Sequence, residues 1–421
     1  MPYHKSLNYA RELDIKDSLS YLRNEFYIPK DTQGNESIYF TGNSLGLQPK
    51  ITQQYIQQEL DDWARFGVEG HFEARNPWLS YHEFLTNSMA KIVGAKPIEV
   101  VVMNTLTTNL HLLMVSFYQP TAKKYKILIE SDAFPSDRYA VQSQLAFHGY
   151  DPKQGLVEWK PREGEELLRM EDLEKILEEE GDEIALLLIG GVNYYTGQFL
   201  DLKRIAALGH QKGCIVGIDL AHGAGNIQPN LHESHVDFAA WCTYKYLNAG
   251  PGSLSGLFVH EKHAHKKELP RFAGWWNHNK ETRFNMRQPF DVMAGAEGWQ
   301  LSNPPILSMA AIRASLDIFE KVGMDALLQK SKKLTGYFEF LINQIGSDKI
   351  KIITPNNPNE RGCQLSIQVK NAEKDLHKKL TKNNIITDWR EPDVIRCAPV
   401  PMYNSFEDVY RMVKILESLL R

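Results

Sequence analysis

The sequence predicts an α/β protein in which a mostly parallel central sheet is flanked by helices and followed by a smaller α+β C-terminal domain. Short apolar runs alternate with helical patterns through the middle of the chain, as they do in parallel sheets. One such run, 215–219, ends in Asp219, which would lie beyond the carboxyl ends of the strands, where ligands bind. With 421 residues the chain exceeds the usual limit for one core, so two domains are expected.

The elements of the predicted sheet follow one another in strand–helix order. The run 126–130 indicates a buried strand that leads into a loop, and the helical pattern 172–180 precedes a strand at 184–189. A further helix at 201–212 precedes the strand that ends at Asp219. Strands that alternate with helices in this way favour a parallel arrangement.

The last quarter of the chain has a different pattern. Pro305 opens a long helical stretch, and the runs 364–369 and 393–396 indicate strands of a smaller unit. Ser405 is a good N-cap, with Asp408 three residues on. The helix after it carries one apolar stripe: Val409, Met412, Val413, Leu416, Leu419 and Leu420.

These patterns divide the chain into two domains. We predict a large domain at 61–305 and a small domain at 306–421, with the segment 1–60 packed against the small domain. No internal repeat or low-complexity linker interrupts the sequence.

Composition excludes several classes of partner. Hydrophobic residues at 43%, charged residues at 24% and a net charge of −4 are typical of a soluble globular protein without a footprint for nucleic acid or anionic lipid. The apolar run 184–189 is too short to span a bilayer, and the N-terminus lacks a signal-type apolar core. The four cysteines, Cys214, Cys242, Cys363 and Cys397, show no CxxC spacing, so we expect reduced thiols and a cytoplasmic protein.

Two segments suit a phosphorylated aromatic ligand. Leu106 and Thr107 stand where a helix begins, and the free N–H groups of a helix start attract a dianionic phosphate. An ordinary threonine N-cap is the alternative there. In the Phe134-Pro135-Ser136-Asp137 loop, the aromatic ring can stack on a flat heterocycle and the polar groups can bond its rim. A proline-containing turn is the alternative for this loop.

Asp219 and Lys245 together indicate a pyridoxal phosphate enzyme. Such enzymes need a lysine to hold the cofactor as a Schiff base and an acid to keep its ring nitrogen protonated. Lys245 follows Asp219 by 26 positions and lies in a chiefly apolar and aromatic segment, which favours the neutral amine that acts as nucleophile and base. His222 could lie near the cofactor or be a satisfied buried histidine.

Two further motifs suggest other chemistry. The segment 42–46 fits the G-x-S-x-G pattern of serine hydrolases, but it precedes the main α/β alternation and lacks an oxyanion loop, so we interpret it as a turn. The histidines at 260, 263 and 265 suggest a metal, but they lack helical spacing, so we predict a solvated loop and no metal site.

The assembled motifs resemble those of the kynureninase family, pyridoxal phosphate hydrolases of the aminotransferase-like superfamily with fold type I. The resemblance covers nearly the whole chain and rests on motifs in this order: TGNSLGL, NTLTTNLHLLM, FPSD, GVNYYTGQ, DLAHGAGN, YKYLNAGPG, GWW, SNPPIL and RCAPVPMYNS. A set of this length in this order is highly specific.

The resemblance implies the roles of individual residues at the cofactor. Lys245 would form the Schiff base, Asp219 would face the pyridine nitrogen, and Tyr244 would contact the phosphate and transfer a proton. Trp275 and Asn303 would reach the site from a second subunit, which implies a homodimer with shared active sites. The implied cofactor-binding set is Leu106, Thr107, Phe134, Pro135, Ser136, Asp137, Asp219, His222, Tyr244, Lys245, Trp275 and Asn303.

The substrate side combines residue chemistry with the resemblance. Arg396 lies among apolar neighbours and could grip an amino acid's α-carboxylate with two hydrogen bonds. His71, Ser44 and Asn303 are implied contacts to an aromatic substrate ring, so we predict that 3-hydroxykynurenine is accepted. Gly190 is a departure, because relatives can carry serine there and its hydroxyl contact is lost.

The resemblance implies hydrolysis of the Cβ–Cγ bond of L-kynurenine or 3-hydroxy-L-kynurenine, in tryptophan catabolism and NAD biosynthesis. Lys245 would take the Cα proton, water would add to the γ-carbonyl, and cleavage would release an anthranilate and L-alanine, with Tyr244 as proton donor. The alternatives are a cysteine desulfurase or class V aminotransferase, and a non-catalytic regulator on the same fold. A desulfurase needs a mobile cysteine, and a regulator would be expected to lose Lys245 or Asp219.

Overall fold

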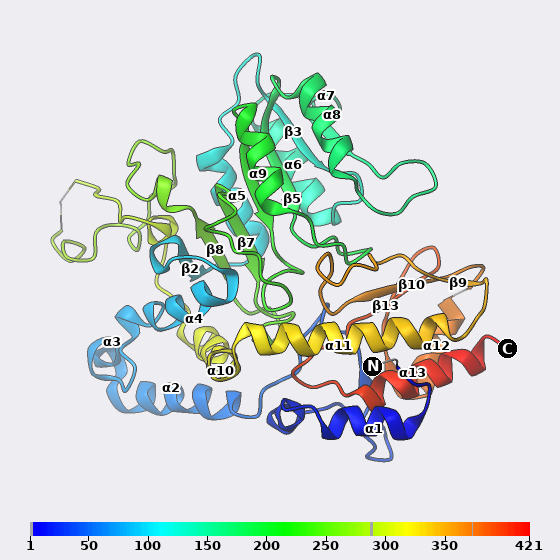
Figure 1. Cartoon of the computed structure of the whole chain (residues 1–421). Coiled ribbons are helices and arrows are strands. Elements are labelled where there is room, and N and C mark those ends of the chain that lie inside the picture. Colours follow the sequence, from blue (N-terminus) through cyan, green and yellow to red (C-terminus); the bar gives the residue numbers. More distant parts are fainter. Residues whose placement is uncertain (1–2, 287–288, 373) are drawn as a thin grey trace.

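A seven-stranded sheet forms the centre of the computed structural model, which describes residues 3–286, 289–372 and 374–421 (Figure 1). In spatial order its strands are β2 (Val100–Met103), β8 (Ser255–Val259), β7 (Phe238–Cys242), β6 (Ile215–Asp219), β5 (Ile184–Gly190), β3 (Lys126–Glu130) and β4 (Leu156–Trp159). Pairings among β7, β6, β5, β3 and β4 are parallel, whereas β8 pairs antiparallel with both β7 and β2. The carboxyl ends of the six parallel-running strands therefore meet at one edge of the sheet, which we call the carboxyl edge.

The strands are apolar along their length because helices cover both faces of the sheet. Along β5, Leu187 and Ile189 belong to one apolar core, and Leu186 and Leu188 belong to another on the opposite face. Alternate side chains of a strand point to opposite faces, so a continuous apolar run is what a doubly covered strand requires. The helices that follow the strands of this region are α5 (Leu106–Phe117), α6 (Pro135–Phe147), α7 (Pro152–Gly155), α8 (Met170–Glu180) and α9 (Leu202–Gln211).

A second, antiparallel sheet lies in the C-terminal part of the chain, in the order β12 (Asp388–Arg390), β13 (Val394–Cys397), β10 (Leu365–Val369) and β9 (Ile350–Ile352). Its helices are α11 (Met324–Asn343), α12 (Lys374–Lys382) and α13 (Phe406–Leu419). Ser405 and Asp408 form a capping box at the start of α13, as the sequence predicts. The stripe residues Val409, Met412, Val413 and Leu416 are buried in the core of this unit.

The N-terminal segment contacts both parts of the molecule. Strand β1 (Ile38–Tyr39) pairs in parallel with β11 (Ile385–Ile386) of the C-terminal part, and α1 (Leu7–Ile15) contacts α13. Helix α2 (Thr52–Phe66) packs instead against α10 (Ile306–Val322), which also contacts α4 (Glu83–Val93). Further short helices are α3 (Gly70–Glu73) and the 3₁₀ turns Ser20–Glu25, Gly67–Glu69, Trp78–Ser80, Pro97–Glu99, Glu261–His263 and Ala296–Trp299. The domain boundaries proposed above stay predictions.

The predicted fold class is confirmed: the central sheet is mostly parallel and flanked by helices, with a separate small antiparallel sheet near the C-terminus. The predicted strands and helices appear within two residues of their expected ends. Among the helices in the described ranges, none has the length and apolar character needed to cross a bilayer.

Candidate active site

A cavity of about 190 Å³ opens at the carboxyl edge of the large sheet. It is lined by Thr105, Leu106, Thr107, Glu130, Phe134, Ser136, Asp137, Gly190, Val192, Tyr194, Asp219, Ala221, His222, Tyr244 and Lys245. Three of these residues, Glu130, Gly190 and Asp219, end the strands β3, β5 and β6.

Two helices begin at this cavity. Helix α5 starts at Leu106, and its N-cap Thr105 makes no side-chain capping bond, so the first N–H groups of the helix remain without that partner. Helix α6 starts at Pro135, and its residues Ser136 and Asp137 line the cavity. The hydroxyls of Thr107 and Ser136 lie 2.9 Å apart and so join the two helix starts. The positive ends of two helices and a pair of hydroxyls suit a phosphate group.

Three carboxyl groups line the floor of the cavity. Asp219 is buried, accepts a hydrogen bond from the backbone N–H of Ala221 at 2.6 Å, and shares a hydrogen bond with Asp137. Burial, followed by the charge of Asp219, raises the pKa of the Asp137 carboxyl well above its ordinary value. Burial also raises the pKa of Asp219 and raises that of Glu130 to about 7. Burial therefore favours the protonated forms of these carboxyl groups, and a cationic group on a ligand would supply the compensation that lets one of them ionise.

Lys245 and His222 form the wall beside Asp219. The Lys245 ammonium donates to Nε2 of His222 at 3.1 Å, and Nδ1 of His222 is buried without a partner. Burial and the charge of Lys245 lower the pKa of His222 well below its ordinary value, so this imidazole is neutral. Burial raises the pKa of the neighbouring Tyr244 hydroxyl, which therefore stays protonated at neutral pH.

The loop that carries Lys245 is held by the N-terminal TGNSLGL turn. The backbone N–H of Gly46 donates to the carbonyl of Tyr244 at 2.8 Å, and a Cβ atom on Gly46 would lie 2.2 Å from the carbonyl oxygen of Lys245. Glycine is therefore required where the turn meets the lysine loop. Ser44 lies in this turn and is exposed, so the segment has the turn conformation that its sequence indicates.

Arg396 lies on β13 and is 1% exposed. Its guanidinium donates to the carbonyl of Tyr194 at 2.7 Å, pairs with Asp388, and leaves Nε buried without a partner. Tyr194 itself lines the cavity and meets Phe134 edge to face at a centroid distance of 5.3 Å. The small sheet therefore places Arg396 against Tyr194, a residue of the cavity lining.

Arg396 is not part of the described lining of the cavity, and five other residues expected at the site also lie outside that lining. Pro135 opens α6 with its ring exposed. Ser44 and Asn303 are exposed, and Trp275 is 42% exposed with its indole N–H bonded to the carbonyl of Arg283. His71 bonds through Nδ1 to the carbonyl of Val68 at 2.9 Å. These positions leave the roles expected for the five residues as predictions.

The structure also adds cavity residues to which the sequence analysis assigned no role, and all but Glu130 lie within the quoted motifs: Thr105, Glu130, Val192, Tyr194 and Ala221. Glu130 could have been found, because the run 126–130 ends in an acid at a buried strand end in the same way as the run that ends at Asp219. Tyr194 gives no comparable signal, because its place follows from packing between two sheets.

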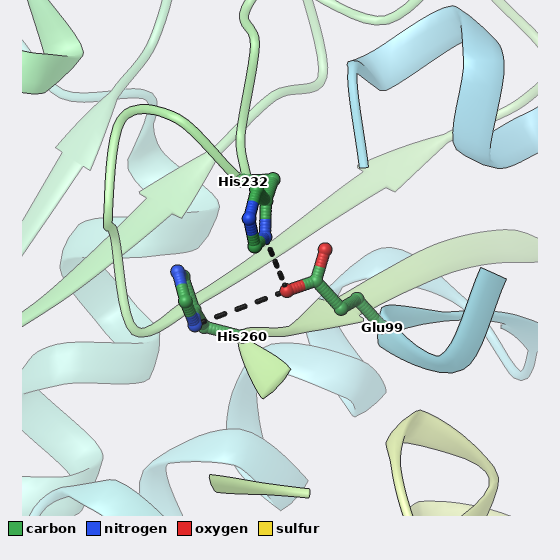
Figure 2. Close-up of side chains that lie close together, drawn as sticks. All are labelled: Glu99, His232 and His260. Atoms are coloured by element: carbon green, nitrogen blue, oxygen red, sulfur yellow. Dashed lines mark hydrogen bonds and ion pairs between the residues drawn. The ribbon is translucent and has the colours of Figure 1, made fainter. Parts of the chain in front are cut away.

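The histidine-rich segment after β8 is not the solvated loop that we expected. His260 and His263 are buried, and only His265 of the three is exposed. Figure 2 shows His232 and His260 beside Glu99, whose carboxylate lies 2.9 Å from Nδ1 of His232. Backbone N–H groups also bond this cluster: Lys96 and Glu261 donate to Glu99, and Lys262 donates to His260. The cluster is therefore explained as a hydrogen-bonded buried network.

The cavity residues fit pyridoxal phosphate. The helix starts suit its phosphate, the Phe134 ring at 45% exposure is free to stack, and the carboxyl of Asp219 suits a protonated ring nitrogen. Lys245 is the amine at the cavity wall, and the unpartnered Nδ1 of His222 leaves a buried donor for a ligand atom. The four cysteines are all buried and none belongs to the described lining, so the mobile thiol of a desulfurase has no candidate here.

The fold is shared with pyridoxal phosphate enzymes of fold type I. An apo cysteine desulfurase from Thermococcus onnurineus NA1 superposes with a TM-score of 0.76 at 18% identity, covering 94% of this chain and 97% of that one. The cystine C-S lyase C-DES, solved as a mutant with glycine covalently linked to its PLP cofactor, gives 0.78 at 17% identity, covering 94% and 98%. Identities this low establish the fold class alone.

Sequence relatives then establish the family. A kynureninase of Myxococcus xanthus is 56% identical over 419 residues, covering 100% of this chain and 98% of that one. A kynureninase of Mus musculus is 48% identical over 430 residues, covering 98% and 92%. The kynureninase C-terminal domain model matches residues 327–416. The chain belongs to the kynureninase family.

Proposed function

We propose that this chain hydrolyses the Cβ–Cγ bond of L-kynurenine, 3-hydroxy-L-kynurenine or both, with pyridoxal phosphate as its cofactor. The products are anthranilate or 3-hydroxyanthranilate and L-alanine, and the enzyme is a hydrolase acting on carbon–carbon bonds in ketonic substances. The observation that carries the proposal is that Lys245 and Asp219 line one cavity in a chain of the kynureninase family. The reaction belongs to tryptophan catabolism and NAD biosynthesis through kynurenine.

The residues at the two helix starts would hold the cofactor. The N–H groups at Leu106 and Thr107, with the hydroxyls of Thr107 and Ser136, support a phosphate site. Phe134 would stack on the ring, and the Asp219 carboxylate, hydrogen-bonded by Asp137, would keep a proton on the ring nitrogen. When bound, pyridoxal phosphate supplies an electron sink that stabilises negative charge on carbon atoms next to the substrate amine.

Proton transfer would be divided between two neighbouring side chains. Lys245 would hold the cofactor, and its amine would then move the proton of the substrate's Cα. The Tyr244 hydroxyl, protonated because burial raises its pKa, is placed beside Lys245 to give a proton to the carbon that becomes the methyl group of alanine. Water supplies the oxygen that turns the γ-carbonyl into the carboxylate of the anthranilate.

Arg396 would bind the α-carboxylate of the substrate. Its buried Nε has no protein partner, and its position behind Tyr194 places a positive charge next to the cavity wall. A carboxylate that reaches this guanidinium gains charge-assisted hydrogen bonds in surroundings that contain little water. His71, Ser44 and Asn303 are proposed contacts to the aromatic ring of the substrate.

The active enzyme is proposed to be a homodimer. Trp275, His71 and Asn303 lie outside the described lining of the cavity in their own chain, and Trp275 presents an exposed indole. This supports their delivery to the cavity of a second subunit, where Trp275 and Asn303 would complete the cofactor site. A cytoplasmic location is also proposed, supported by four cysteines that form no disulfide in the described structure.

One assay tests the function. The purified protein, loaded with pyridoxal phosphate, is incubated with kynurenine or 3-hydroxykynurenine, and the fluorescent anthranilate products and alanine are measured. Stoichiometric release of both products is expected. A protein that binds the cofactor but releases alanine from neither substrate would contradict the proposal, and transamination products would favour the aminotransferase alternative.

A second assay tests the shared site. Mixing Lys245→Ala with Trp275→Ala subunits should create one intact site in each mixed dimer, because each chain supplies what the other lacks. Random exchange then restores about a quarter of wild-type activity, since half of the dimers are mixed and half of their sites are intact. A mixture with no more activity than its two components would contradict sharing through Trp275.

A further inference from the structure

One buried acid in the cavity has no role in the proposed reaction. Glu130 ends β3, is 4% exposed and lines the cavity floor. Both of its carboxyl oxygens accept from the backbone N–H of Gly190, at 2.9 and 3.1 Å. Backbone hydrogen bonds do not outweigh the burial of this carboxyl group, so the side chain is held in place while its charge is left poorly compensated.

Glu130 depends on the glycine that faces it. A Cβ atom on Gly190 would lie 2.4 Å from Oε1 of Glu130, which is closer than any real contact of this kind. Gly190 is the last residue of β5, and the register of the sheet places it directly beside Asp219 of β6. The glycine therefore leaves space for the Glu130 carboxyl next to the acid proposed to face the cofactor's ring nitrogen.

The charges around Glu130 come from four elements. Asp219 on β6 and Asp132 in the loop after β3 raise its pKa, in addition to the larger effect of burial. The charges of Asp219 and Glu130 raise the pKa of Asp137 on α6. The charge of Lys245, which follows β7, lowers the pKa values of Asp137 and Asp219. Any change in the charge of Glu130 is therefore transmitted to the hydrogen-bonded Asp137–Asp219 pair.

We propose that Glu130 is a positioning residue that sets how tightly the Asp137–Asp219 pair holds a proton on the cofactor, and that Gly190 makes room for it. This inference rests on the proposed function for the identity of the ligand. An ionised Glu130 adds negative charge beside Asp219 and strengthens the hold on protons at the cofactor, and a neutral Glu130 weakens it. Its pKa of about 7 allows both forms near neutral pH.

The test is a pH titration of the visible absorbance of the cofactor bound to the holoenzyme. In Glu130→Gln the side chain keeps its shape but stays neutral, so the apparent pKa read from the absorbance should fall by about one unit, the order expected for one charge a few ångströms away. Glu163→Gln is the matched control, because it makes the same change at an exposed acid that is outside the described cavity lining and is not among the charges that act on Glu130, and the cofactor titration should then stay within about 0.3 units of wild type. An unchanged titration in Glu130→Gln would overturn the proposal.

A second variant keeps the inference testable if Glu130→Gln fails to fold. Gly190→Ala retains the acid but forces its carboxyl away from the N–H group, so its titration should move toward that of Glu130→Gln. A Gly190→Ala enzyme that titrates as wild type would overturn the proposal. The absorbance measurement needs bound cofactor but no turnover. A wild-type protein that cleaves neither substrate would therefore contradict the proposed function, while the effect of Glu130 on the cofactor could still be measured.

Discussion

Buried carboxyl groups at the two edges of the large sheet have opposite surroundings. At the carboxyl edge, burial raises the pKa values of Asp137 and Asp219, since few donors reach them. Asp237 lies at the other edge, just before β7, and its pKa is far below the ordinary value. Although burial alone would raise it, hydrogen bonds from His210 and His263 and the charge of Lys262 outweigh burial.

The number of donors, rather than depth, separates these two regions. Asp237 accepts from His210 at 2.9 Å, from His263 at 2.8 Å and from the backbone N–H of Val216 at 2.8 Å, and pairs with Lys262 at 2.7 Å. The hydrogen-bonding capacity of the Asp237 carboxylate is taken up by these protein groups, and the interactions stabilise the fold. The acids at the carboxyl edge have fewer protein donors, so their oxygens can still accept hydrogen bonds from a ligand. Their burial without those partners lowers the stability of the fold.

The largest expected contrast is between two lysines, one at each edge. Lys245→Ala should lower kcat with kynurenine on the order of 10⁴-fold or more and remove the visible absorbance of the cofactor–lysine bond, because no other cavity residue in the described lining is an amine. Lys262→Ala, which removes a partner of Asp237, should leave both readouts near wild type. A Lys245→Ala enzyme with normal turnover would contradict the proposed role of Lys245 as the residue that binds the cofactor and transfers the proton.

Two isosteric acid-to-amide changes should separate activity from stability. Asp219→Asn should reduce kcat by about 100-fold or more, because the ring nitrogen loses its charged partner, while leaving the free energy of unfolding close to wild type. Asp237→Asn should instead destabilise the fold by about 3 kcal/mol, since the buried ion pairs lose one partner. Urea unfolding and kcat per folded molecule measure the two effects, and equal losses of activity would erase the distinction between the edges.

Two buried arginines extend the comparison to cations. Arg396→Lys should raise KM for kynurenine by about 30-fold, roughly 2 kcal/mol, because a lysine cannot reproduce a paired contact with a carboxylate. Arg361 is also buried but pairs with Glu339 at 2.6 Å, away from the cavity lining. Arg361→Lys should therefore lower stability and leave KM unchanged. If both variants change KM by the same factor, the proposed contact between Arg396 and the α-carboxylate of the substrate is wrong.

The smallest expected effect is a difference in pH dependence. The pKa of Asp237 is lower in the folded chain than in the unfolded chain, so its stabilisation is present above the ordinary aspartate pKa of 3.8 and is lost as pH falls below it. Asp237→Asn should flatten this acid loss by on the order of 2 kcal/mol. Glu130 has the opposite sign: its stabilisation is present below 4.5 and is lost as pH rises to about 7. Unfolding curves at about pH 2 to 8, which include the acid loss at Asp237 and the loss at Glu130, distinguish the two.

Local patterns were sufficient for much of the fold and for part of the site. The acid that ends the run 215–219 and the helix start at Leu106 were both recognisable, because strand ends and helix starts are short-range features. The buried histidines after β8 were misjudged, because the acids that they face, Glu99 for His260 and Asp237 for His263, are far away in the sequence. Glu130 was missed although its run has the same form as that of Asp219.

The sequence by itself determined the order of strands and helices and the family, and it indicated the lysine and acid proposed to face the cofactor, because these depend on residue type and local spacing. The tertiary structure decided which groups meet across the sheet. The clash that ties Gly190 to Glu130, the contact of the Gly46 turn with the lysine loop, and the opposite pKa shifts at the two edges all depend on distances between residues far apart in the chain. Electrostatic energies follow those distances and the local burial, and neither is written in a linear pattern.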